Sequence, residues 1–312
     1  TLMNKSTAAS LAVEMLSRGT TSLTRTQVQD SLSKLKARVN IGGAGNNVSV
    51  RVETIRANLL PTLDLVAQQL RSPRFDADEF AKLKQEELAG IEAGKSEPQV
   101  LASIELNRRL NPVPKGHVLY VSSPDESVAE INAATLDDVK RFHSEFMGAS
   151  FADIAIVGDF DPAATRDAVT RLFGDWASPQ PFSRLVRVYA PTDSAMTSIL
   201  TPDKAQAIYL SAQTIELSDA DPDYPAMLLA NYMLGGGFLN SRRATRLRQR
   251  DGLSYGVGSG FSAQSLDQYA VFQGFAIYAP QNADRVVTAF REELDRALRE
   301  GFTQAEVDAA KT

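Results

Sequence analysis

An internal repeat is the feature that most restricts how this chain of 312 residues can fold. The helical pattern Leu-Ala-x-x-Met-Leu at 11–16 recurs 218 residues later at 229–234. A phenylalanine followed four positions later by glutamate at 74–79 recurs at 301–306, which requires nine extra residues in the second copy. This period is far longer than the roughly 20–50 residues of a solenoid repeat. The repeat predicts two homologous domains, the second of them truncated.

Apolar periodicity and turn residues predict a similar order of helices and strands in both halves. In the first half, helices are expected at 8–19, 24–35, 61–70, 76–93, 99–110, 136–145 and 161–174. Strands are expected at 38–42, at 48–54 with Val48, Val50 and Val52 facing inward, and at 152–158, with a turn over 43–47. After a turn-rich linker at 176–182, helices are expected at 225–234, at 240–250 and from 281, with two strands before the last. The order predicts an α+β fold with domains at 1–178 and 186–312.

Composition excludes several classes of protein. The net charge is −5 and the basic residues are scattered, which is not the footprint of a nucleic-acid binder. No apolar run approaches the ~18 residues of a membrane helix, so we expect a soluble chain with neither nucleic-acid nor membrane partners. The absence of cysteine excludes disulfides and thiolate chemistry but suits both cytosol and periplasm. Because the chain starts at Thr1 and ends at Thr312 just after a helix begins, we expect a piece of a longer polypeptide.

The sequence offers few residues for catalysis. A catalytic zinc takes about three protein ligands, but the two histidines, His117 and His143, lack the i, i+4 spacing that would pair them on a helix. We expect surface or capping roles for both. The carboxylates Glu86 and Glu87 could pair for acid–base work, although such runs are usually solvated helix faces. No Gly-x-Ser-x-Gly nucleophile motif is present.

A glycine run and two polar residues after it form the best candidate site. Gly235, Gly236 and Gly237 precede an expected helix, whose N-terminus would suit an anion or a peptide carboxylate. Arg248 closes that helix and Tyr255 opens the next strand. A charged guanidinium fork and a phenol can therefore converge on one rim.

The segment 236–257 resembles the insulinase/pitrilysin metallopeptidases. It matches their pattern Gly-Gly-x-x-x-Ser-Arg, followed by Leu-Arg and, seven positions after that arginine, tyrosine. The paired arginine and tyrosine of the family fall on Arg248 and Tyr255. The segments 75–85, 157–162 and 172–175 also look like recurring features of the family. The resemblance covers essentially the whole chain and implies two α/β-sandwich domains, each a mixed or antiparallel sheet with helices on one face.

The resemblance also implies that the metal motif of the family is lost. The inverted zinc motif His-x-x-Glu-His of the catalytic domain would fall on 10–14, where Ser10, Val13 and Glu14 replace the first histidine, the glutamate base and the second histidine. Glu86 or Glu87 lies near the position of the distal carboxylate ligand. We therefore expect no metal or other cofactor on this chain, with zinc held by a partner. The N-terminal strands of the first domain are expected to be missing.

The function implied is that of the non-catalytic, substrate-binding half of a zinc-dependent metalloendopeptidase. Two such halves enclose a chamber as a clamshell, so the expected partners are a peptide and a catalytic half carrying His-x-x-Glu-His, fused upstream or separate. Exported bacterial relatives suggest the periplasm, with the cytoplasm as the alternative. Two other readings stay open: a scaffold of the same fold without peptidase function, and a self-sufficient enzyme with an unrecognised site.

Overall fold

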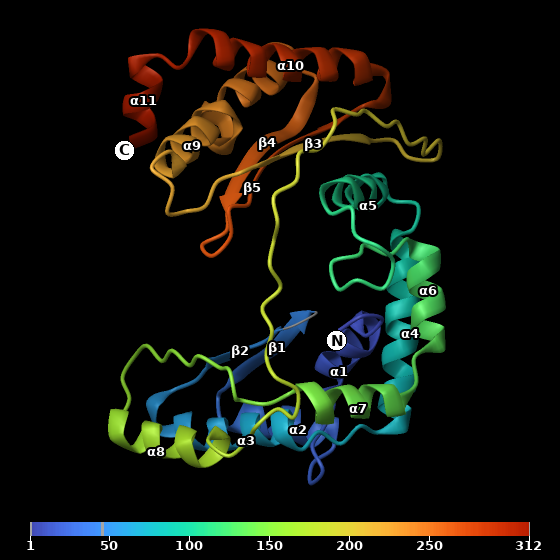
Figure 1. Ribbon diagram of the computed structural model, residues 1–312, viewed down its shortest axis with the longest axis vertical. Coiled ribbons are helices and arrows are strands. Elements are labelled where there is room, and N and C mark those ends of the chain that lie inside the picture. Colours follow the sequence, from blue (N-terminus) through green and yellow to red (C-terminus); the bar gives the residue numbers. More distant parts are fainter. Residues whose placement is uncertain (1, 45–46, 312) are drawn as a thin grey trace. The chain divides into compact units, whose positions relative to one another are not determined.

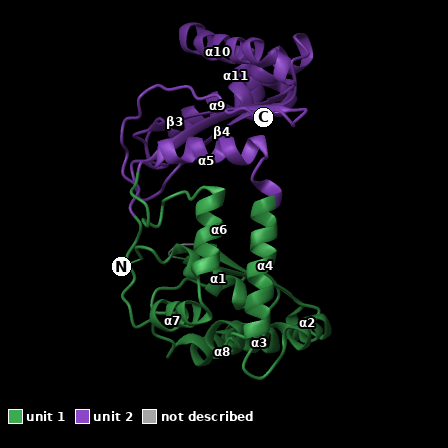
Figure 2. Ribbon diagram, turned by 90° about the vertical axis from the view of Figure 1, so that its right-hand side faces the viewer, with its two compact units in different colours: residues 1–92, 113–185 green, residues 93–112, 186–312 purple. Residues whose placement is uncertain are grey.

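A computed structural model describes residues 2–44 and 47–311 and divides the chain into two compact units. One unit comprises 1–92 with 113–185, and the other comprises 93–112 with 186–312 (Figure 2). The boundary at 185 lies close to the predicted linker, but the excursion 93–112 into the second unit was not predicted. Of the turn predicted over 43–47, residues 45 and 46 lie outside the described residues, as do Thr1 and Thr312.

The first unit is a helical layer around a small β-hairpin. Its elements are α1 (Ser6–Met15), α2 (Arg25–Lys34), β1 (Arg38–Ala44), β2 (Asn47–Glu53), η1 (Arg56–Asn58), α3 (Leu59–Arg71), α4 (Ala77–Gly94), α6 (Pro124–Ala133), α7 (Leu136–Phe146) and α8 (Pro162–Phe173) (Figure 1). The apolar face of α1 packs against β1 and α7 and forms the centre of the core. Val50 and Val52 pack on this core as expected, whereas Val48 is exposed.

Local sequence explains where these helices begin. Thr24 caps α2 in a reciprocal capping box with Gln27, and Asp161 caps α8 by accepting hydrogen bonds from two backbone N–H groups. The same signal is present at α6, where Ser123 and Glu126 form a capping box. Helix α6 was not predicted, although this signal is present in the sequence.

The second unit is built on the antiparallel sheet β3–β5–β4. Its elements are α5 (Pro98–Leu110), β3 (Ala207–Ile215), α9 (Tyr224–Asn231), η2 (Tyr232–Gly236), η3 (Phe238–Asn240), η4 (Ala244–Arg250), β4 (Ser254–Ala263), β5 (Ala270–Tyr278), η5 (Pro280–Asn282), α10 (Ala283–Glu300) and α11 (Gln304–Lys311). Tyr209, Ala276 and Val257 lie side by side across the three strands. Residues of η4 and α10 pack on this row, while α5 packs against β3. The strand β3 was not predicted.

The predicted repeat is visible in the order of elements. Helix, helix, hairpin, helix, helix from α1 to α4 recurs from α9 to α11, with η2 continuing α9 and the π-helical η4 in the place of α2. An ion pair recurs with it. Arg25 of α2 binds Glu79 of α4 at 3.2 Å, and Arg242 ahead of η4 binds Glu306 of α11 at 2.6 Å. The predicted α+β class is confirmed, and both sheets are antiparallel. The homology of the two halves stays a prediction.

The predicted strand at 152–158 is wrong. The segment forms no strand, and most of its side chains are exposed, with Val157 99% exposed. An apolar run favours a strand only when a neighbouring strand accepts its backbone hydrogen bonds, and no strand pairs with it among the described residues.

Within 2–44 and 47–311, none of the helices combines the length and the apolar character needed to cross a membrane.

The Arg242–Glu306 pair makes a pH-dependent contribution to stability. The Arg242 guanidinium lowers the pKa of Glu306 to about 2, assisted by hydrogen bonds from Thr303. Because this folded-state pKa is depressed, the stabilisation is complete above about pH 5 and is lost as the pH falls towards 2. We expect Glu306→Gln to lower the free energy of unfolding by roughly 1–2 kcal/mol at pH 7, after discounting for solvent screening.

Urea denaturation of both proteins at pH 7, 4 and 2 measures this effect. The difference between wild type and Glu306→Gln should shrink as the pH falls. The matched control is Glu300→Gln, which removes a carboxylate from a mostly exposed pair with Arg296 and should change stability by less than about 0.5 kcal/mol. A difference that stays constant between pH 7 and 2 would contradict the assignment.

Candidate functional site

Five arginines stand between 242 and 250, and their contacts decide which of them can meet a ligand. Arg242 is committed to α11. Its guanidinium donates to both carboxylate oxygens of Glu306 at 2.6 and 2.7 Å and to the Gly301 carbonyl at 2.9 Å, and it lies over the Phe302 ring. This bidentate arrangement is a strong, directional ion pair. Arg242 therefore has a structural role, because it holds the segment ahead of η4 against α11.

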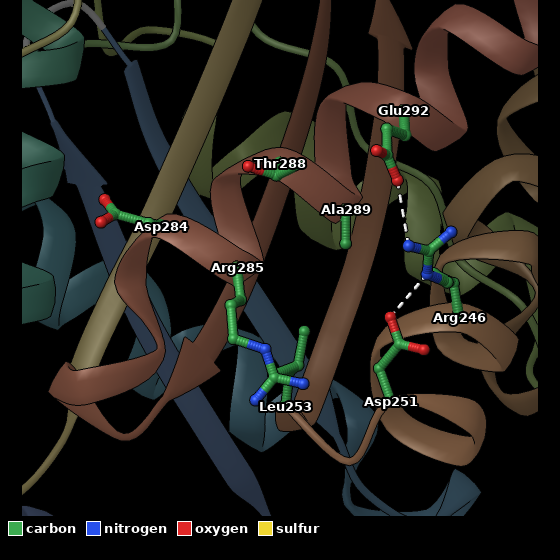
Figure 3. A pocket seen from close by; sticks show the side chains of 8 residues that line it. All are labelled: Arg246, Asp251, Leu253, Asp284, Arg285, Thr288, Ala289 and Glu292. Carbon is green, nitrogen blue, oxygen red and sulfur yellow. Dashed lines mark hydrogen bonds and ion pairs between the residues drawn. The ribbon is translucent and has the colours of Figure 1, made fainter.

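Arg246 and Arg250 are held by carboxylates. Arg246 donates to Asp251 at 2.5 Å and to Glu292 at 3.0 Å, while Arg250 lies 3.3 Å from Asp251. Figure 3 shows Arg246 between its two partners at the edge of an open pocket of about 370 Å³. The pocket is lined by Arg246, Asp251, Leu253, Asp284, Arg285, Thr288, Ala289 and Glu292. Arg248 is not among these residues.

Arg243 is completely buried. Its guanidinium stacks on Phe290 at 3.7 Å and lies 5.4 Å from the Phe272 ring, and its nitrogens have no hydrogen-bond partner among the described residues. Burial lowers its pKa to about 10, so the side chain stays charged at neutral pH. Cation–π contact replaces hydrogen bonding here. Arg243 belongs to the core and is inaccessible to a ligand.

Arg248 differs from the other four arginines. It is exposed on η4, and its guanidinium lies 5.9 Å from the Phe238 ring. Of the five, it is the exposed arginine for which the described part of the chain gives no carboxylate partner. Its charge is therefore available to an incoming group. The element that carries it is a π-helix, a form that often occurs at functional sites.

Tyr255 is directed outward by a β-bulge. The pairing of β4 with β5 shifts between Ser254 and Gly256, so Tyr255 has no partner on β5. A bulge of this kind re-aims a side chain. The ring is 58% exposed, and its hydroxyl donates to Gln206 Oε1 at 3.0 Å. Sequence reasoning missed Gln206, for which no local signal exists.

Arg248 and Tyr255 lie near the two ends of a short loop that is closed by a backbone hydrogen bond. The backbone N–H of Leu253 donates to the Leu247 carbonyl at 2.7 Å, and both leucine side chains are buried. Arg248 follows the first of these anchors, and Tyr255 lies two residues beyond the second. The two predicted residues therefore flank one loop with fixed ends. Their shared role in binding stays a prediction.

The three glycines lie in a different setting from the one expected. Gly235 and Gly236 lie inside the π-helix η2, and Gly237 follows it, so the helix from α9 runs into the glycines instead of ending before them. A Cβ on Gly235 would lie 2.4 Å from Ser259 Oγ and 2.9 Å from the Ser259 nitrogen. Close packing of η2 on β4 thus explains this glycine. Anion binding by the glycine run stays untested.

The degenerate metal positions do not fit a catalytic zinc. On α1, Ser10 and Glu14 are exposed, whereas the Val13 side chain is buried in the core. Glu86 is engaged elsewhere, because the buried Arg18 donates to its carboxylate at 2.6 Å and also lies 3.5 Å from Glu79. This bond lowers the Glu86 pKa. Within the described residues, no three His, Cys, Asp or Glu side chains are grouped to hold a metal ion.

The remaining candidate acids and bases have local contacts. Glu87 is exposed on α4. His117 Nδ1 accepts a hydrogen bond from the Leu119 backbone at 3.1 Å. His143 Nε2 lies 2.7 Å from the Leu70 carbonyl, which fixes the proton on that nitrogen, and burial lowers its pKa. These contacts are structural, in keeping with the capping roles expected for the histidines.

Comparison with known proteins identifies the family to which this architecture belongs. The chain has an α+β fold and carries Ser10, Val13 and Glu14 where the resemblance predicts the metal motif of a peptidase-like protein. Residues 133–312, more than half of the chain, match the family described as the peptidase M16 inactive domain. The chain therefore belongs to the M16 peptidase family, which confirms the insulinase-type resemblance.

Individual relatives agree with this assignment. The chain is 21% identical over 312 residues to the non-peptidase homolog YmxG of Helicobacter pylori, covering 97% of this chain and 68% of that protein. The structure of a peptidase M16 inactive domain from Pseudomonas fluorescens matches with a TM-score of 0.85 and 28% identity over 99% of this chain and 73% of that one. The periplasmic protease PqqL from Escherichia coli has the same fold, with a TM-score of 0.71 and 15% identity over 99% of this chain and 34% of that one.

The packing of Gly235 gives a stability prediction. We expect Gly235→Ala to destabilise the chain by about 1–3 kcal/mol, because the new methyl group meets backbone and side chain of Ser259 on β4. The matched control is Gly90→Ala within α4, where a Cβ meets nothing within 4 Å and helix propensity favours alanine by about 1 kcal/mol. Thermal unfolding of both variants measures the difference. Equal stability of the two variants would show that η2 does not pack closely on β4.

Proposed function

We propose that this chain is the non-catalytic, substrate-binding half of a zinc-dependent metalloendopeptidase that acts on peptides or small unfolded proteins. The observation that carries the proposal is the state of the arginines between 242 and 250. Four of them are committed to ion pairs or to the core, and Arg248, the position singled out by the family motif, is exposed without a carboxylate partner among the described residues. Membership of the M16 inactive-domain group supports a non-catalytic role.

The chemistry of the two side chains suits a peptide near its cleavage point. Arg248 can donate to a backbone carbonyl of the substrate as a charged, delocalised fork. The Tyr255 hydroxyl can turn from Gln206 to the scissile carbonyl oxygen, where negative charge develops in the transition state. Neither group provides a nucleophile. Both would bind and stabilise a substrate that is cleaved by groups on another polypeptide or domain.

The proposed partner is a catalytic half with an intact His-x-x-Glu-His motif, fused upstream or separate, which encloses the peptide together with this chain. Zinc bound there would supply the activated water. The described residues of this chain offer no fitting donor set of their own, since Val13 is buried and Glu86 is held by Arg18. We place the assembly in the periplasm, an assignment that fractionation of the source cells would test.

Reconstitution tests the proposal directly. Peptide hydrolysis and zinc content are measured for this chain, for a His-x-x-Glu-His half from the same source, and for their mixture. We expect this chain alone to be inactive with less than about 0.1 equivalents of zinc, and the mixture to be active. Stoichiometric zinc and hydrolysis by this chain alone would overturn the proposal. An inactive mixture would favour the scaffold reading.

The substrate-binding role predicts a specific defect in the active mixture. Arg248→Ala and Tyr255→Phe should each lower kcat/KM by about 10²–10³-fold, because each removes a donor to charge that develops on the substrate. The matched control is Arg250→Ala on the same helix, which is also exposed and should leave kcat/KM within about 2-fold of wild type. Circular dichroism checks that each variant is folded. Unchanged kcat/KM in Arg248→Ala would refute the role given to this residue.

A further inference from the structure

Exposed apolar side chains lie at the turn that follows the glycine run, and one of them, Phe238, is next to Arg248. Tyr232, Phe238 and Leu239 are all exposed and surround the turn after the glycine run. The Tyr232 ring lies against Gly237, since a Cβ there would come within 3.0 Å of it. The Leu239 carbonyl accepts a hydrogen bond from Gln249 on η4 at 2.9 Å, next to Arg248. A group of apolar residues at the surface is more informative than single exposed ones.

Phe238 also has a strained backbone. Its φ of +48° lies in the left-handed region, which is unfavourable for a bulky side chain. Phe75 in the first unit has the same φ, but its ring packs on the core and contacts His143 edge-on at 5.3 Å. The Phe238 ring is 67% exposed, so burial does not offset the strain there. Strain of this kind concentrates at functional sites.

The surrounding turn fixes this conformation. The Phe238 carbonyl accepts hydrogen bonds from the Ser241 hydroxyl at 2.7 Å and from the Ser241 backbone at 3.2 Å, and Ser241 is fully buried. The Gly237 carbonyl accepts from the Asn240 backbone at 3.2 Å. The ring is thus presented to solvent by a preorganised turn, which limits the entropy lost when a ligand covers it.

We propose that Phe238, with Tyr232 and Leu239, forms a subsite for a large apolar side chain of the peptide substrate, while Arg248 binds the backbone of the same peptide. This proposal rests on the proposed function and names the substrate class of that site. The Arg248 guanidinium lies 5.9 Å from the Phe238 ring. This distance is close to the length of two residues of an extended peptide, which rises by about 3.3 Å per residue. A peptide offers a carbonyl and an apolar side chain at this separation.

The test uses the active mixture and two fluorogenic peptides that differ at one position near the scissile bond, which is phenylalanine in one and serine in the other. Phe238→Gly removes the ring and keeps the turn, because glycine accepts a positive φ. We expect this variant to lower kcat/KM by about 10-fold or more for the phenylalanine peptide and by less than 2-fold for the serine peptide. Phe238→Leu should restore most of the loss. Arg248→Ala should affect both peptides alike.

The matched control is Leu298→Ala on α10, which removes an apolar side chain that is 77% exposed elsewhere in the same unit and should change neither rate. Equal losses for both peptides in Phe238→Gly, or no loss at all, would overturn the subsite while leaving the proposed function intact. A set of peptides carries the phenylalanine at successive positions around the scissile bond, so that in at least one of them the ring can reach the subsite.

A binding assay separates failure of the subsite from failure of the proposed function. Fluorescence anisotropy of the same peptides, labelled with fluorescein, is measured on this chain without any catalytic half. A preference for the phenylalanine peptide that is lost in Phe238→Gly supports the subsite even if every mixture is inactive. Equal binding of both peptides to the wild-type chain overturns the subsite. So does self-association of the wild-type chain in sedimentation experiments, if Phe238→Gly abolishes it.

Discussion

The burial of η4 against the β3–β5–β4 sheet decides which way the arginines of this helix point. Ala244 and Leu247 pack with Val257 and Ala276 under α10, and Arg243 is carried into the core with them. A helix anchored by these positions must turn Arg248 to solvent. The hydrogen bond from Leu253 to Leu247 then ends the helix and starts β4, where the bulge turns Tyr255 outward. Apolar packing thus decides which polar groups are offered to a ligand.

The two halves share one order of elements and one recurring ion pair. In both, an arginine near the second helix binds a glutamate in the last helix, Arg25 to Glu79 and Arg242 to Glu306. In the first half, ion pairs lie where the family resemblance predicts a metal position, since Arg18 binds Glu86 and approaches Glu79. The Arg18 guanidinium balances the charge of these carboxylates.

Predictions from sequence succeeded where neighbouring residues decide the outcome. The caps at Thr24 and Asp161 and the apolar stripe of α3 were sufficient to place helices. The predictions failed where a segment distant in the sequence decides whether a strand forms. The segment 152–158 has the composition of a strand, but no described strand pairs with it, and β3 was missed although it pairs along its whole length with β5. Strand formation depends on a neighbour that the local sequence does not reveal.

The sequence by itself determined the family, the absence of a His-x-x-Glu-His motif and the positions of Arg248 and Tyr255, because each is a property of residue types at fixed spacing. Only the tertiary structure decided which arginine is free. Glu306, Glu292 and Phe290 come from α10 and α11, more than 40 residues along the chain, and they occupy Arg242, Arg246 and Arg243 in turn. Availability of a charge depends on what packs beside it, and that is set by the fold.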